Sequence, residues 1–139
     1  MTVVVPALLA QTVDELAAQE ARIQAFATRV HVDIMDGQFA PTVSVPPTDI
    51  TWPEAWEVDM HVMYGQPASQ IKNLIDTQPS LVIIHAEAEG NLLECVQTLQ
   101  KAGIKAGIAL QRSTVPTDVA DLINVVDHVL IFSGNLGQY

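Results

Sequence analysis

The chain of 139 residues has few basic residues and a single cysteine. Six Lys and Arg residues face 16 Asp and Glu residues, which gives a formal net charge of −10. Such a surface repels phosphate backbones, so we expect no nucleic-acid partner. A small anionic substrate stays compatible, because a few backbone N–H groups can bind a phosphate. Cys95 has no second cysteine to pair with, which favours a reducing, cytoplasmic location.

Long apolar runs are also absent. Pro, Gly or polar residues interrupt every apolar stretch, so we expect no membrane span and no membrane partner. Residues 1–6 lack the basic flank of a signal peptide and are typical of a strand. Hydrophobic residues make up 49% of the chain and charged residues 16%, which indicates a globular protein. The length predicts one domain, spanning residues 1–139.

Short apolar runs rich in β-branched residues begin about every 23 to 28 residues, a spacing typical of βα units. They are residues 3–6, 29–35, 57–63, 80–85, 105–110 and 128–132. A helix is expected over 13–27, where Thr12 and Glu15 form a capping-box pattern. Others are expected from Asn91 to a stop at Gly103, and over 117–126. Alternating strands and helices predict a parallel sheet with helices packed outside it.

The connection between residues 41 and 57 is different. Pro46, Pro47 and Pro53 exclude a long helix, so we expect a loop with at most a short turn. Trp52 and Trp56 are expected to cover the sheet where a helix would otherwise pack.

Two of the predicted strands carry ionisable groups on one face. Alternate side chains of a strand share a face, so His31, Asp33 and Met35 point one way. In the next strand Asp59, His61 and Met63 share a face. Burying an unpaired charge costs free energy, so we expect these ionisable groups to have a functional role. Two imidazoles and one carboxylate brought together in this way could hold a divalent metal.

These strands resemble the ribulose-phosphate 3-epimerase family. The resemblance rests on residues 31–41 (HVDIMDGQFAP) and 59–63 (DMHVM), and continues through 84–87 (IHAE), 103–110 (GIKAGIAL) and 126–130 (VDHVL). It implies a (β/α)₈ barrel acting on D-ribulose 5-phosphate and D-xylulose 5-phosphate, with a divalent metal held by two histidines and two aspartates. Zinc, iron, manganese and cobalt are the candidate metals.

The resemblance also assigns roles by position. His31, Asp33 and His61 match three metal ligands, and Asp33 matches one of two acid/base groups that exchange the proton at C3. Met35 and Met63 match methionines that line the pocket. Further candidates for substrate contact are His85, Gly134 and Gly137. For His85 and Glu87 the competing interpretation is structural hydrogen bonding, and for the glycines a frayed terminus. Asp59 could orient His61, or lie at the strand entrance.

The resemblance further implies a truncated family member. The family's seventh strand carries the second catalytic aspartate, which is the fourth ligand, and the loops after strands seven and eight carry most of the phosphate site. We therefore expect an α/β barrel of TIM type cut to about six strands, with self-association covering its open edges. Asp36, Glu87 or a residue of a partner subunit would then replace the missing aspartate.

Two other functions stay open. The chain could be a non-catalytic remnant that binds metal or sugar phosphate, or a structural subunit that needs a partner chain. It could also be a decarboxylase or hexulose-phosphate synthase of the related barrels. Those enzymes carry an Asp-x-Lys-x-x-Asp motif, and Met35 stands where their lysine would be, so this hypothesis ranks last.

Overall fold

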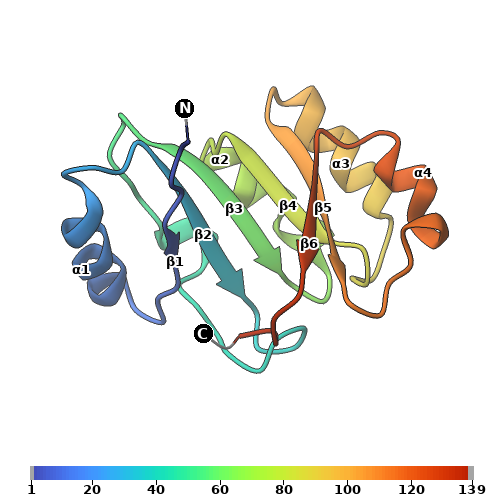
Figure 1. The fold of residues 1–139 in the computed structure, drawn as a ribbon, viewed down its shortest axis with the longest axis horizontal. Helices are drawn as coiled ribbons and strands as arrows, with labels where there is room; N and C mark the ends of the chain where they lie inside the picture. Colours follow the sequence, from blue (N-terminus) through green and yellow to red (C-terminus); the bar gives the residue numbers. More distant parts are fainter. Residues whose placement is uncertain (1, 138–139) are drawn as a thin grey trace.

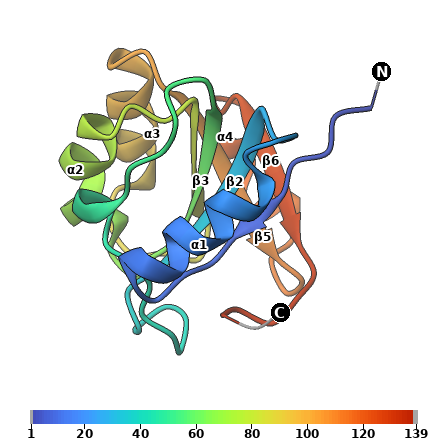
Figure 2. The same cartoon turned by 90° about the vertical axis from the view of Figure 1, so that its left-hand side faces the viewer.

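The computed structural model describes residues 2–137 and contains one six-stranded sheet (Figure 1). All neighbouring strands are parallel, and their order in the sheet follows the chain. They are β1 (Ala7–Leu8), β2 (Arg29–Met35), β3 (Glu57–Met63), β4 (Leu81–His85), β5 (Lys105–Gln111) and β6 (His128–Phe132). The sheet curls into part of a TIM-type (β/α) barrel with helices between the strands, as the strand spacing predicted (Figure 2).

Four helices connect the strands: α1 (Val13–Ile23), α2 (Ile71–Asp76), α3 (Leu92–Lys101) and α4 (Ala120–Ile123). Single 3₁₀ turns lie at η1 (Pro47–Asp49), η2 (Pro67–Gln70) and η3 (Pro116–Val119). The N-caps are the expected ones, since Thr12 accepts the Glu15 N–H and Asn91 accepts the Glu94 N–H. Within residues 2–137, none of the helices has the length and apolarity needed to cross a bilayer.

The main core lies between the outer face of the sheet and the helices. Alternate residues of β2 and β3 supply it, among them Val30, Ile34 and Met60, all fully buried. Leu74 of α2 and Leu99 of α3 pack against them. The opposite, inner face of the same strands carries the histidines and aspartates, so the alternation predicted for both strands is confirmed.

Several predicted boundaries are wrong. The strand expected over 3–6 lies at Ala7–Leu8, because pairing with β2 begins where the Pro6 carbonyl accepts the His31 N–H. The helix expected over 13–27 ends at Ile23. The helix expected over 117–126 is only the η3 turn followed by α4.

Two connections show what the prolines do. The 41–57 segment holds only the η1 turn, as expected, and Trp56 is buried in the core with Trp52 packed against it. The β3–β4 connection contains α2, which the apolar pattern did not reveal. Its six residues follow the η2 turn that opens at Pro67.

Candidate functional site

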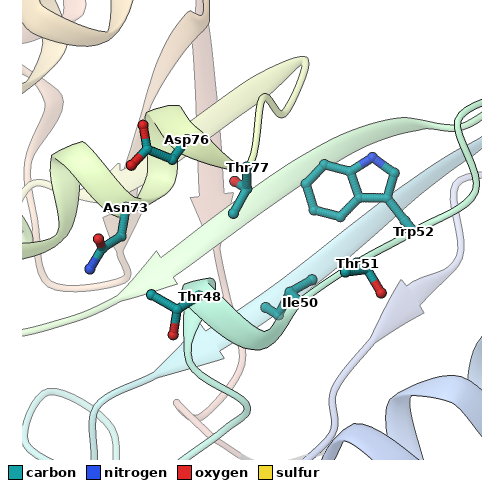
Figure 3. A pocket seen from close by; sticks show the side chains of 7 residues that line it. All are labelled: Thr48, Ile50, Thr51, Trp52, Asn73, Asp76 and Thr77. Carbon is teal, nitrogen blue, oxygen red and sulfur yellow. The ribbon is translucent and has the colours of Figure 1, made fainter.

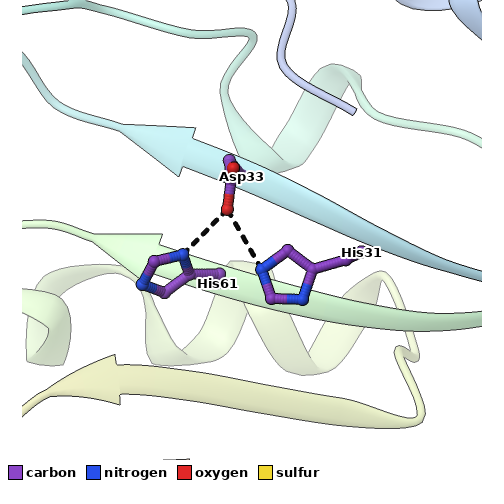
Figure 4. A group of neighbouring side chains, drawn as sticks. All are labelled: His31, Asp33 and His61. Carbon is purple, nitrogen blue, oxygen red and sulfur yellow. Dashed lines mark hydrogen bonds and ion pairs between the residues drawn. The ribbon is translucent and has the colours of Figure 1, made fainter. Parts of the chain in front are cut away.

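The parallel register of β2 and β3 brings the predicted metal ligands together. Asp33 lies opposite His61, and His31 lies opposite Asp59. Figure 4 shows both imidazoles turned toward Asp33. The Asp33 Oδ1 atom lies 2.8 Å from His61 Nδ1 and 3.1 Å from His31 Nε2. One carboxylate oxygen thus stands between two ring nitrogens contributed by adjacent strands.

This cluster has the donors and the spacing of a metal site. His31, Asp33 and His61 each offer one ligand atom, and these atoms lie within 4.8 Å of one another. Two ligands of a tetrahedral zinc ion, each at about 2.1 Å, are separated by about 3.4 Å, within about 0.6 Å of the two distances seen here. Two imidazoles with one carboxylate suit zinc, iron, manganese or cobalt. The residues therefore fit a divalent cation.

A row of hydrogen-bonded side chains extends from His61 of the cluster to His85 and Glu87. His61 Nε2 lies 2.8 Å from His85 Nε2, and His85 Nδ1 lies 3.1 Å from a Glu87 oxygen. The other Glu87 oxygen accepts the Gln111 N–H at 2.8 Å and the Thr114 hydroxyl. His85 therefore contacts a metal-ligand candidate, and it is completely buried.

Burial and hydrogen bonding set the charge states of His85 and Glu87. Burial, and then the nearby His61, lower the pKa of His85 to about 4, so its imidazole is neutral near pH 7. Burial raises the pKa of Glu87, but hydrogen bonds from Thr114, Gln111 and His85 outweigh that effect, and the net pKa lies below its usual value. Glu87 is thus an ionised acceptor facing a neutral imidazole.

The two methionines predicted for the pocket lie together beyond the histidines. Met35 and Met63 are paired in register and buried in one small cluster with Ala40. The rings of Phe39 and Phe132 flank the histidines, with centroids 4.9 Å and 5.8 Å from that of His85. Apolar walls therefore surround the polar cluster.

The glycines expected to contact substrate lie in the loop after β6. An added Cβ at Gly137 would be 3.4 Å from Met35 Sδ, so this glycine lies beside the methionine cluster. Gly134 lies instead against the Phe132 ring. Gln138, which follows Gly137 in the sequence, is outside the described residues.

Of the two interpretations of Asp59, its place at the entrance of the strand is confirmed, and it does not orient His61. Asp59 forms a two-point ion pair with Arg29, in which Nε and Nη2 lie 2.9 Å and 3.0 Å from the two carboxylate oxygens. Both residues lie on the inner face at the amino ends of β2 and β3. The alternation that places His31 and Asp33 on that face also places Arg29 there, so the ion pair between Arg29 and Asp59 could have been predicted from the sequence.

Asp36 joins two loops at the carboxyl ends of the strands. Its Oδ1 accepts the N–H groups of Gln38 and Phe39, and its Oδ2 accepts the N–H of Gly65. Gly37 follows with φ +76°, as expected of a turn. Asp36 is therefore bound to backbone on both oxygens.

One hollow of the surface lies away from this cluster. It measures about 450 Å³ and lies outside the sheet, between the segment around η1 and helix α2 (Figure 3). Thr48 and Trp52 line one side, and Asn73 and Asp76 the other. None of its lining residues belongs to the inner face, so the hollow has no part in the histidine chemistry.

The sequence did not indicate Gln111 and Thr114 as partners of Glu87. They come from the end of β5 and the loop after it, and no motif or spacing links them to β4. The same holds for the contact between His61 and His85, which depends on the register between β3 and β4.

Comparison with known proteins agrees with this geometry. The model of the ribulose-phosphate 3 epimerase family matches residues 3–139. A chloroplastic ribulose-5-phosphate-3-epimerase of Arabidopsis thaliana is 29% identical over 97% of this chain and 50% of its own length. Ribulose-phosphate 3-epimerases of Synechocystis and Helicobacter pylori J99 are 30% and 29% identical, over 97% and 96% of this chain and 61% and 63% of theirs. The chain thus spans about half to two thirds of these relatives. The paired strands that carry the histidines and Asp33 lie within the matched segment, and the chain belongs to the ribulose-phosphate 3-epimerase family.

Proposed function

We propose that this chain carries the metal-binding half of an epimerase site, which exchanges the proton at C3 of D-ribulose 5-phosphate and D-xylulose 5-phosphate. The observation that carries the proposal is the convergence of His31, Asp33 and His61 within 4.8 Å on the inner face of a family-matched barrel. These three residues would hold the cation, with at least one position left for substrate oxygens.

The chemistry follows from the residue types. A divalent cation, when bound, supplies positive charge near the oxygens on which an ene-diolate accumulates negative charge. Asp33 is the acid/base group, since its carboxylate stands at the cluster and can take the C3 proton on one face of the sugar. Met35 and Met63 exclude water while adapting to the shape of the sugar.

A second acid/base group must act on the opposite face for the configuration to invert. Asp36 and Glu87 were candidates, but both oxygens of each already accept hydrogen bonds. We therefore assign neither to that role and propose that the opposing acid comes from outside residues 2–137. The chain alone would then remove and return the proton from one face.

Solvent deuterium tests this division of labour. D-ribulose 5-phosphate is incubated in D₂O with the chain and Mn²⁺ or Zn²⁺, and C3 deuteration and D-xylulose 5-phosphate are both quantified. A one-sided site exchanges the C3 hydrogen and forms little D-xylulose 5-phosphate. Rapid formation of D-xylulose 5-phosphate would show that the chain contains both acids. Neither exchange nor product with the metal bound would remove the catalytic proposal and favour a binding subunit.

We also propose that the chain self-associates through the edges of the sheet. Within residues 2–137, strands β1 and β6 each pair with a single neighbouring strand. On β6 the outer side chains of Val129 and Ile131 are 40% and 65% exposed, and Val4 before β1 is 74% exposed. Exposed apolar edges favour pairing with another chain. Sedimentation at micromolar concentration should show a dimer or larger species, and a monomer would count against self-association.

The cytoplasmic location also stays a prediction.

A further inference from the structure

The hydrogen bonds behind the cluster raise a question of proton placement. Asp33, His61, His85 and Glu87 form a row with three short gaps, of 2.8, 2.8 and 3.1 Å. Each gap needs one proton or cation between its two atoms. Two neutral imidazoles supply only two N–H groups. One gap must therefore hold an additional proton or a metal ion.

Glu87 decides which gap that is. Its carboxylate is fixed by the Gln111 N–H and the Thr114 hydroxyl, and its other oxygen faces His85 Nδ1 at 3.1 Å and accepts from it. With its proton on Nδ1, the completely buried His85 ring presents a lone pair at Nε2, which accepts from His61 Nε2 at 2.8 Å. This leaves a lone pair on His61 Nδ1, facing Asp33 Oδ1 at 2.8 Å. The gap that holds the additional proton or the metal ion is thus the one bordered by the three ligand atoms.

From this geometry we infer that His85 and Glu87 are positioning residues, which hold His61 in the tautomer that presents Nδ1 to the metal. The inference rests on the metal site of the proposed function. Neither residue touches the cation in this scheme, and both act through His61. The burial of His85 suits the role, because a ring with 0% exposure between β3 and β5 has few alternative orientations.

Zinc affinity tests the inference without requiring activity. Purified full-length chain is titrated with Zn²⁺ against a chromophoric chelator. His85→Phe preserves a ring but removes the acceptor, and loss of an outer partner of this kind weakens metal binding by about 10- to 100-fold. His85→Gln retains an acceptor near the place of Nε2 and should recover most of that loss. Glu87→Ala should weaken binding more than Glu87→Gln, which keeps one oxygen acceptor.

Ile83→Ala is the matched control. Ile83 lies two residues before His85 on the inner face of β4, is buried and pairs in register with His61, but its side chain has no donor or acceptor for the row of hydrogen bonds. It should lower the stability of the fold and leave zinc affinity within about twofold. Loss of affinity in Ile83→Ala equal to that in His85→Phe would reduce His85 to a packing role and overturn the inference.

The tautomer gives a second readout. In the zinc-loaded chain, long-range ¹H–¹⁵N spectra should show His61 protonated at Nε2 and His85 protonated at Nδ1. The reverse tautomer of His61 overturns the inference even if zinc binds tightly. If the unmodified chain binds no zinc, the metal site and the positioning role both fail. If zinc binds with the expected tautomers but C3 exchange is absent, only the catalytic proposal fails.

Discussion

The inner face of β2 and β3 carries two adjoining polar regions, and they differ in how their charges balance. At the amino end, Arg29 and Asp59 form a pair in which two N–H groups meet two carboxylate oxygens. Toward the carboxyl end, Asp33 meets two imidazoles, and in the proposed tautomer His61 Nδ1 faces the carboxylate without a proton. The first region is complete by itself, whereas the second takes up an additional proton or a metal ion.

Burial alone does not separate the two regions. Asp59 is 7% exposed, so it is as well covered as many core residues. What separates them is the balance of donors and acceptors. The positive guanidinium and the negative carboxylate neutralise each other and meet in a fixed two-point geometry. Imidazoles, which can donate or accept, leave lone pairs for a ligand. The difference predicts that substitutions in the first region change stability and those in the second change binding.

The largest effect is expected for Asp33→Asn. An amide oxygen is a weaker metal ligand than a carboxylate and cannot take a proton from carbon. Zinc affinity should fall by about 100-fold or more, beyond the loss expected for an outer partner. Exchange of the C3 hydrogen should fall by about 10²- to 10⁴-fold. Chelator competition and D₂O exchange measure the two quantities.

Stability serves as the control for Asp33→Asn. Asn is nearly the same size as Asp, so the free energy of unfolding without metal should change by less than about 1 kcal/mol. If zinc binds to Asp33→Asn as tightly as to the unmodified chain, Asp33 is not a ligand. If exchange at C3 continues at the original rate, it is not the base.

A smaller effect, on stability and not on metal binding, is expected for Arg29→Met. The methionine retains the apolar stem of arginine but leaves the Asp59 carboxylate covered and unpaired. Breaking a buried pair costs about 3–5 kcal/mol, and exposure of the Arg29 side chain by 37% lowers that to about 2 kcal/mol here. Urea denaturation measures the loss. Zinc affinity should be unchanged, and a tenfold loss of affinity would mean that the two regions are coupled.

The same comparison shows what could be predicted from the sequence. The bounds of β2 and β3 match the structure because their alternation is strict over seven residues each. That alternation also placed His31, Asp33 and His61 on one face, and the parallel pairing of β2 with β3 brings them together. Periodicity of two encodes the face of a strand directly.

Elements that depend on their neighbours were missed. The three valines at 3–5 have high β-propensity, but they lack a partner strand and are exposed. Helix α2 is only six residues long, too short for a helical pattern to stand out. Glu87 has partners at the end of β5 and in the following loop, and this juxtaposition arises from the register between β4 and β5. Local pattern cannot reveal such contacts.

The smallest effect is expected for Asp36→Asn, at the rim above the metal region. Burial raises the pKa of Asp36, but backbone N–H groups from Phe39, Gly65 and Gln38 outweigh it and hold the pKa below the usual 3.8. An Asn side chain has one acceptor oxygen, so at pH 7 the Gly65 N–H loses its partner, at a cost of about 1 kcal/mol.

Acid should erase this difference. A carboxyl whose pKa is lowered by folding contributes its stability in full above its unfolded pKa, here about 3.8. The contribution is lost as the pH falls through the lower value of the folded state. The difference in unfolding free energy between Asp36→Asn and the unmodified chain should therefore be constant from pH 7 to 5 and shrink below pH 4. A difference that grows in acid would mean that Asp36 is held as the neutral acid, and that the two loops are joined by a different contact.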